Sequence, residues 1–123
     1  MNHIITWGEI PVTDMARAKA FYSEVFDVSF TDDHMGDYEM AMFSANPALI
    51  SGALVKGPDY NPSKDGTIVY LNAGEDLSPA LERAQHLGRE VICPKTAIKD
   101  GDCGYFAQIL DTEGNRVGLY SLK

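Results

Sequence analysis

Hydrophobic positions in the first half of the chain predict one strand, one helix and three further strands. Residues 4–12 are rich in side chains that favour β-structure. Over residues 14–26 the apolar positions recur at gaps of three and four, which puts them on one face of a helix. That face consists of Met15, Ala18, Tyr22, Val25 and Phe26. Strand-like runs follow at 28–31, 38–43 and 48–55, and Asp32, Asp33 and Gly36 are typical of a turn before the second run.

The second half repeats this order after a polar, proline-containing segment. We predict a first module over about residues 1–57, a linker over about 58–63 and a second module over about 64–123. A strand at 67–72 precedes a helix whose start is marked by Ser78-Pro79, because proline suits the first helical position. The apolar helix face is Leu77, Leu81, Ala84 and Leu87, and Gly88 marks the end. Further strands are predicted at 90–93, 104–110 and 116–121.

A single offset of 62 residues relates the two halves. It aligns the helix starts, faces and ends through the pairs Asp14 and Asp76, Ala18 and Ala80, and Val25 and Leu87. The alternative is a chance similarity between two ordinary amphipathic helices. A true repeat predicts an α+β fold in which two βαβββ modules form a curved mixed sheet around a cleft.

Alternation along the strands indicates which side chains face that cleft. In the first strand Trp7 and Glu9 share one face, while Ile10 belongs to the opposite face, which the helices should cover. Alternation also turns one of Tyr105 and Phe106 toward the cleft, and we assign Tyr105 to it. Plain packing in the core is the alternative for these aromatic side chains.

Composition narrows the classes of partner. The chain has 123 residues and is 45% hydrophobic, which suits one globular domain. Its net charge of −8 repels nucleic acid and anionic membranes. We find neither an apolar run of membrane-spanning length nor the pattern of a signal peptide, and we expect a cytoplasmic protein. Cys93 and Cys103 make no disulfide framework and are expected to be ordinary thiols.

Three stretches resemble one protein family. IPVTDMARAKAFYSEVF, GTIVYLN and DTEGNRVGLYS are similar to segments of the glyoxalase/bleomycin resistance protein/extradiol dioxygenase superfamily, also called the vicinal oxygen chelate (VOC) superfamily. The whole chain looks most like its short branch related to lactoylglutathione lyase. The resemblance implies the glyoxalase/bleomycin resistance/dihydroxybiphenyl dioxygenase-like fold and a ligand-binding cleft.

The resemblance also implies positions for metal ligands, which this sequence fills with other residues. The four positions match Trp7, Ser51 or Gly52, Thr67 and Gly118, none of which is a histidine or a carboxylate. Indole, glycine and threonine do not replace the donors that zinc or nickel prefers. His3, His34 and His86 fall on separate elements. We therefore predict no metal and no other cofactor. The alternative, a divalent metal held by residues that the pattern does not identify, stays open.

Glu9 is the candidate catalytic residue. A carboxylate on the inner face of a sheet beside Trp7 would be partly desolvated, which would raise its pKa and suit it to act as a general base. In the alternative, Glu9 lies near an edge and reaches water or pairs with Arg116. The predicted ligand-binding cleft consists of Trp7, Glu9, Ser51, Thr67, Tyr105 and Gly118.

Three functions remain open at this point. The first is a protein that binds a small molecule without metal. The second is a lyase, isomerase or dioxygenase-type enzyme that uses Glu9 or a non-standard metal site, but not glyoxalase I. The third is a regulatory or assembly module. We also expect a homodimer, both because the resemblance implies paired modules and because open sheet edges invite association, with the strands at 38–43 and 105–110 as the exposed candidates.

Overall fold

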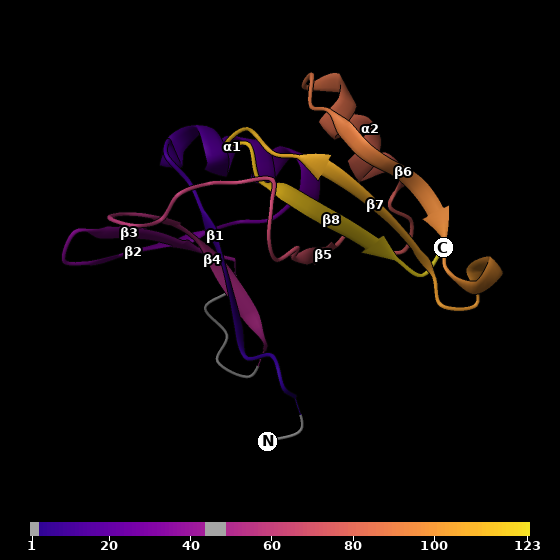
Figure 1. The fold of residues 1–123 in the computed structure, drawn as a ribbon, viewed down its shortest axis with the longest axis horizontal. Helices are drawn as coiled ribbons and strands as arrows, with labels where there is room; N and C mark the ends of the chain where they lie inside the picture. Colours follow the sequence, from indigo (N-terminus) through magenta and orange to yellow (C-terminus); the bar gives the residue numbers. More distant parts are fainter. Residues whose placement is uncertain (1–2, 44–48) are drawn as a thin grey trace.

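The computed structural model describes residues 3–43 and 49–123, which form two modules of the same element order. In the first module the elements are β1 (Trp7–Pro11), α1 (Met15–Phe26), β2 (Thr31–Met35), β3 (Tyr38–Met42) and β4 (Ser51–Lys56). In the second they are β5 (Tyr70–Asn72), α2 (Ser78–His86), β6 (Val91–Ala97), β7 (Tyr105–Leu110) and β8 (Arg116–Ser121), with a short 3-10 turn, η1 (Lys99–Gly101), before β7. Figure 1 shows the two modules in indigo to magenta and in orange to yellow.

The two modules also share one topology. The strand order is β1-β4-β3-β2 in the first sheet and β5-β8-β7-β6 in the second. In each sheet the module's first and last strands run parallel and the other pairs run antiparallel. The predicted α+β fold of two βαβββ modules is therefore confirmed, with its strands in two mixed sheets.

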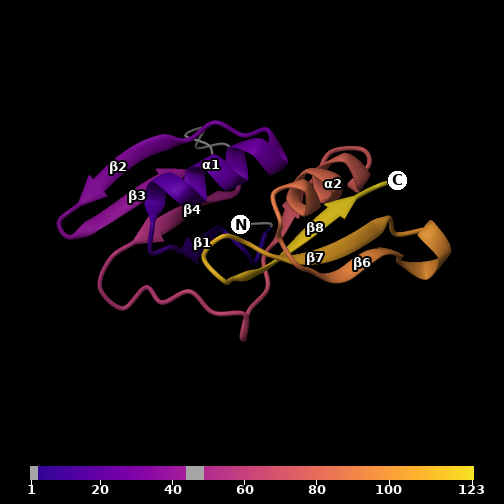
Figure 2. The same cartoon turned by 90° about the horizontal axis from the view of Figure 1, so that it is seen from above.

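One hydrophobic core joins the modules. Both helices contribute to it, and they meet above the sheets as Figure 2 shows. Its fully buried members include Val12, Tyr22, Leu54, Leu77, Ile109 and Leu119. Arg83 of α2 donates to the carbonyl oxygen of Val25 near the end of α1, at 3.1 Å from Nε and 2.7 Å from Nη2. Because the last carbonyl groups of a helix lack partners within it, this contact ties α2 to α1.

The second strand differs from its prediction. β2 spans Thr31–Met35, so it includes Asp32 and Asp33, which the pattern assigned to a turn, and it leaves 28–30 outside the sheet. All five of its side chains are exposed, so no apolar period marks this strand. Backbone pairing with β3 holds it, and the turn is at Gly36, where φ is +61°. Residue 48, the first of the next predicted strand, lies outside the described residues.

The predicted sheet edges were wrong. β3 and β7 each have a neighbour on both sides, and the edges are β1, β2, β5 and β6. The last strand of each module crosses back to pair with the first, so the third strand lies inside the sheet, between the second and the last. β5 is also shorter than the predicted 67–72, and Leu87 is exposed although Val25, its counterpart at the offset of 62, is buried.

Neither helix meets the length and hydropathy of a membrane-spanning segment within residues 3–43 and 49–123.

Candidate ligand-binding cleft

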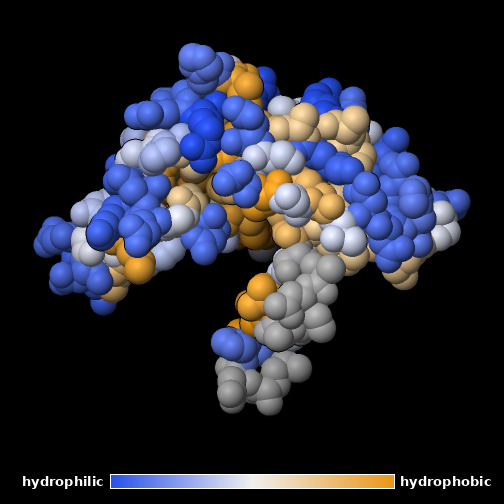
Figure 3. All heavy atoms as spheres, turned by 180° about the vertical axis from the view of Figure 1, so that it is seen from behind, coloured by the Kyte–Doolittle hydropathy of each residue, from blue (hydrophilic) through white to orange (hydrophobic). Residues whose placement is uncertain are grey.

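A largely apolar cleft of about 750 Å³ lies where the edge strands β1 and β5 face each other. No ladder joins these two edges among the described residues, so their side chains are free to line the opening. Four of the six predicted cleft residues line it, namely Trp7, Glu9, Ser51 and Thr67. Phe43, Ile50 and Tyr70 contribute further apolar surface. In Figure 3 hydrophobic residues gather in the hollow near the centre of this face.

Glu9 is held by two aromatic side chains. The hydroxyl of Tyr60 donates to its Oε1 at 2.5 Å, and the indole Nε1 of Trp7 donates to its Oε2 at 3.3 Å. The hydrogen bond to Glu9 raises the pKa of Tyr60 above its ordinary value, because a phenolate there would face a carboxylate. β1 is an edge strand and Glu9 is exposed, so the carboxylate reaches water, as in the alternative, and is not desolvated as expected. Among the ion pairs of the described residues Glu9 takes part in none, so the pairing with Arg116 is not formed.

A smaller polar cavity of about 230 Å³ adjoins the apolar cleft and shares Glu9 and Thr67 with it. Arg116 lines this cavity, together with polar residues of the segment between the modules. Asn115 donates to the carbonyl oxygen of Pro11 at 2.8 Å and accepts from the backbone of Ser63 at 3.0 Å, which fixes that segment against β1. Glu9 thus lies where an apolar space meets a polar one.

The other two predicted cleft residues lie elsewhere. Tyr105 packs against the core, with Lys95 4.8 Å above its ring centre, because its register opposite Ser121 turns it to the helix side of the sheet. Phe106 is the aromatic residue that contacts Tyr70, at 6.2 Å between ring centres. The Tyr70 hydroxyl also accepts from Gln108 at 2.6 Å.

Gly118, the sixth predicted residue, lies beneath the ring of Tyr70. A Cβ atom at position 118 would stand 2.2 Å from Cδ1 of Tyr70. This close approach requires glycine, and any larger side chain would displace the ring. Gly118 therefore forms the floor under Tyr70 rather than part of the cleft wall.

The residues at the family's ligand positions do not fit a metal ion. Trp7 and Thr67 offer an indole and a hydroxyl, and a carboxylate at position 118 would collide with Tyr70. Within the described part of the chain no three His, Cys, Asp or Glu side chains are grouped as metal ligands would be. We derive no chemical step through a metal at these positions.

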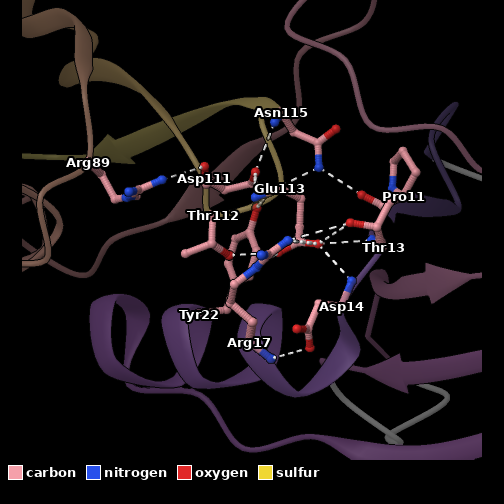
Figure 4. A network of polar contacts seen from close by, with 10 residues as sticks. All are labelled: Pro11, Thr13, Asp14, Arg17, Tyr22, Arg89, Asp111, Thr112, Glu113 and Asn115. Carbon is pink, nitrogen blue, oxygen red and sulfur yellow. Dashed lines mark hydrogen bonds and ion pairs between the residues drawn. The ribbon is translucent and has the colours of Figure 1, made fainter.

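The loop between β7 and β8 fixes the second module against the start of α1. Glu113 accepts from the backbone of Thr13 at 2.9 Å and of Asp14 at 2.8 Å, and from Nε of Arg17 at 2.7 Å, as Figure 4 shows. Burial acts to raise the pKa of Glu113, but these hydrogen bonds outweigh it and lower the pKa to about 2. These contacts join the two modules near Pro11, the last residue of the cleft strand β1.

Tyr60 is the site residue that sequence reasoning missed. It belongs to the segment predicted as a linker, where a single tyrosine carries no periodic signal. Its contact with Glu9 spans 51 positions of sequence, and its ring meets that of Tyr38 at 5.6 Å between centres. Only the fold shows that this segment reaches Glu9 and that its residues Asn61 and Ser63 line the smaller cavity.

Comparison with known proteins identifies similar chains. Residues 1–119 match the family described as "Glyoxalase/Bleomycin resistance protein/Dioxygenase superfamily". A Mycobacterium tuberculosis protein named "Putative glyoxylase CFP32" is 26% identical over an alignment of 119 residues, and the alignment covers 93% of this chain and 44% of that protein. The chain therefore spans less than half the length of this relative.

Two solved structures have a similar fold. The glyoxylase/bleomycin resistance protein/dioxygenase domain from Frankia sp. EAN1pec is 13% identical with a TM-score of 0.72, and 98% of each chain is covered. TnmS3, an antibiotic binding protein from Streptomyces sp. CB03234, is 22% identical with a TM-score of 0.63, covering 98% of this chain and 96% of that one.

Proposed function

Because this chain belongs to the glyoxalase/bleomycin resistance protein/dioxygenase superfamily, we propose that it binds a small organic molecule in the cleft between β1 and β5, without a metal ion. The observation that carries the proposal is the cleft itself: about 750 Å³, lined mainly by apolar and aromatic side chains, with one carboxylate at its polar end. A space of this size and lining is typical of small-molecule sites. The similarity to TnmS3, whose name describes antibiotic binding, supports the same function.

A neutral fluorescent probe tests this proposal. N-phenyl-1-naphthylamine should bind in the cleft and accept excitation energy from Trp7, which is the single tryptophan of the chain. Ile50→Ser should weaken this binding several-fold because Ile50 lines the cleft and is 48% exposed. Leu87→Ser is the matched control, since Leu87 is 46% exposed but is not among the described residues of the cleft.

Absence of energy transfer from Trp7, or equal loss in both variants, would contradict the proposal. The proposal would be supported if the probe raised the melting midpoint of the wild type and of Leu87→Ser but not that of Ile50→Ser. A ligand that binds only the folded state stabilises that state.

An enzyme that uses Glu9 as a base is the second candidate. It is favoured by the position of Glu9 at the junction of the two cavities and by the 2.5 Å hydrogen bond from Tyr60, which orients the carboxylate. A base of this kind would exchange the carbon-bound hydrogens of hydroxyacetone in deuterated water. Exchange that disappears in Glu9→Gln would favour this candidate, and no exchange above the buffer rate would remove it.

We further propose that the protein forms a homodimer and acts in the cytoplasm. Ile5 and Ile50 line the cleft and are exposed, and their neighbours in the chain, Ile4 and Leu49, are exposed as well, Ile4 at 95%. Exposed apolar side chains of this kind are typical of an interaction site, and a two-fold dimer is the commonest way to cover them. The free thiols of Cys93 and Cys103 suit a reducing compartment.

A further inference from the structure

We propose that the cleft prefers ligands that carry a positively charged nitrogen, which binds at Glu9 beside the aromatic side chains of Trp7 and Tyr60. The inference rests on the proposed function, because it names the chemical class of the ligand for the same cleft. It depends on the hydrogen bonds, the aromatic neighbours and the charge around Glu9.

The carboxylate of Glu9 has unused capacity to bind a cation. From the described residues it accepts one hydrogen bond at each oxygen, from Tyr60 and from Trp7, although an ionised carboxylate offers about four acceptor positions. The side chain is exposed, and the ion pairs of the described residues do not include it. A carboxylate that is oriented by two donors but not neutralised is a ready partner for an ammonium group.

The neighbours of Glu9 are the side chains that attract organic cations. Trp7 remains 41% exposed and lines the cleft, whereas Tyr60 reaches Glu9 from a neighbouring groove, where its ring packs in a T-shaped contact with Tyr38. The face of an aromatic ring carries negative potential, so indole and phenol rings bind quaternary and alkylated ammonium groups. A carboxylate with two aromatic neighbours therefore offers both a charge and polarisable surface to one cationic nitrogen.

The charge of the whole chain acts in the same direction. With a net charge of −8 the protein draws cations toward its clefts and repels anions. Arg116, in the adjoining polar cavity, is the one nearby side chain whose charge opposes such a ligand among the residues that line the two cavities. Because Arg116 and Glu9 do not form an ion pair, the carboxylate is left for a ligand.

Two probes of the same shape separate charge from size. We would titrate the protein with (4-hydroxyphenyl)trimethylammonium and with 4-tert-butylphenol, and follow the indole N–H resonance of Trp7 by NMR. At low salt the ammonium probe should bind roughly five- to twentyfold more tightly than 4-tert-butylphenol, because it adds one exposed charge pair and one or two cation–π contacts. High salt should reduce this preference.

Three variants assign the preference to its parts. Glu9→Gln keeps an oxygen acceptor but removes the charge, and it should bring the two probes to within about twofold of each other. Tyr60→Phe should keep most of the preference because the ring stays, whereas Tyr60→Leu should lower it. Glu82→Gln is the matched control: it makes the same change in net charge on the exposed side of α2, and it should leave the preference unchanged.

The outcomes separate this inference from the proposed function. The cation preference is wrong if 4-tert-butylphenol binds as tightly as the ammonium probe. It is also wrong if Glu9→Gln keeps the full preference while its melting midpoint matches that of the wild type. In both cases the cleft still binds small molecules. If neither probe shifts the Trp7 resonance, both the cleft function and the inference are overturned.

Discussion

Tyr22 of α1 donates its hydroxyl hydrogen to Asp111 Oδ2 at 2.6 Å, and both residues are shielded from solvent. The contact links the helix of the first module to the loop before β8, 89 positions away. Burial and the adjacent carboxylate together raise the pKa of Tyr22 well above its ordinary value, so the phenol stays protonated and remains a donor. One buried hydrogen bond therefore connects the two modules.

Tyr22→Phe should destabilise the protein by about 1–2 kcal/mol, since Asp111 Oδ2 would keep only the hydrogen bond from Asn115. Urea unfolding of Tyr22→Phe, Asp111→Asn and the double variant measures the coupling. A coupling energy near zero would mean that the two side chains do not depend on each other for stability.

Glu113 should make the fold sensitive to acid. Its pKa is about 2 in the folded protein against an ordinary value of 4.5. A lowered pKa contributes stability that is fully present above pH 4.5 and is lost as the pH falls toward 2. Since Arg17 is half-exposed, we expect about 2 kcal/mol from this group, below the full value of the shift.

Urea unfolding at several pH values between 7 and 2 checks this prediction. Glu113→Gln should be less stable than the wild type at neutral pH, and the difference between the two should shrink as the pH falls. A difference that stays constant with pH would show that the carboxylate charge is not what stabilises the contact.

Position 118 should tolerate alanine only if Tyr70 is also changed. The new Cβ atom would displace the Tyr70 ring and break its hydrogen bond with Gln108, at a cost of about 1–2 kcal/mol. In a Tyr70→Ala background Gly118→Ala should cost much less. Thermal unfolding of the single and double variants measures the loss of stability caused by Gly118→Ala in each background. Equal losses in both backgrounds would show that the Tyr70 ring does not cause the strain.

Glyoxalase I activity should be absent. Trp7, Thr67 and Gly118 provide no histidine or carboxylate at the family's ligand positions. The purified protein should not convert the hemithioacetal of methylglyoxal and glutathione, and added nickel or zinc should not change this. Turnover that is lost on chelation and restored by metal would show that other residues form a metal site.

The homodimer should depend on the apolar mouth of the cleft. Sedimentation at micromolar concentration should give about twice the chain mass of 13.5 kDa. Ile5→Asp should shift the protein toward the monomer, because it places a charge in the proposed interface. Leu122→Asp, at an exposed residue outside the cleft, should remain dimeric. A wild-type protein that stays monomeric at high concentration would contradict the proposal.

Local pattern alone determined the element order, the repeat and the clearest boundaries. β8 begins and ends where the sequence predicted, and Asp14 begins α1 by accepting from the backbone N–H of Arg17 at 3.0 Å. These features depend on neighbours within a few positions, since helix caps and hydrophobic periods are local. The same alternation correctly assigned Trp7 and Glu9 to one face and Ile10 to the core.

The tertiary structure alone decided the composition of the site. Tyr60 reaches Glu9 only because the segment between the modules folds back along β1, and Phe106 rather than Tyr105 meets Tyr70 because the register of β7 with β8 sets that face. Strand order likewise placed β3 inside its sheet, although the strand at 38–43 was predicted to be an exposed edge. Contacts between distant residues are selected by packing of the whole chain, which no local periodicity encodes.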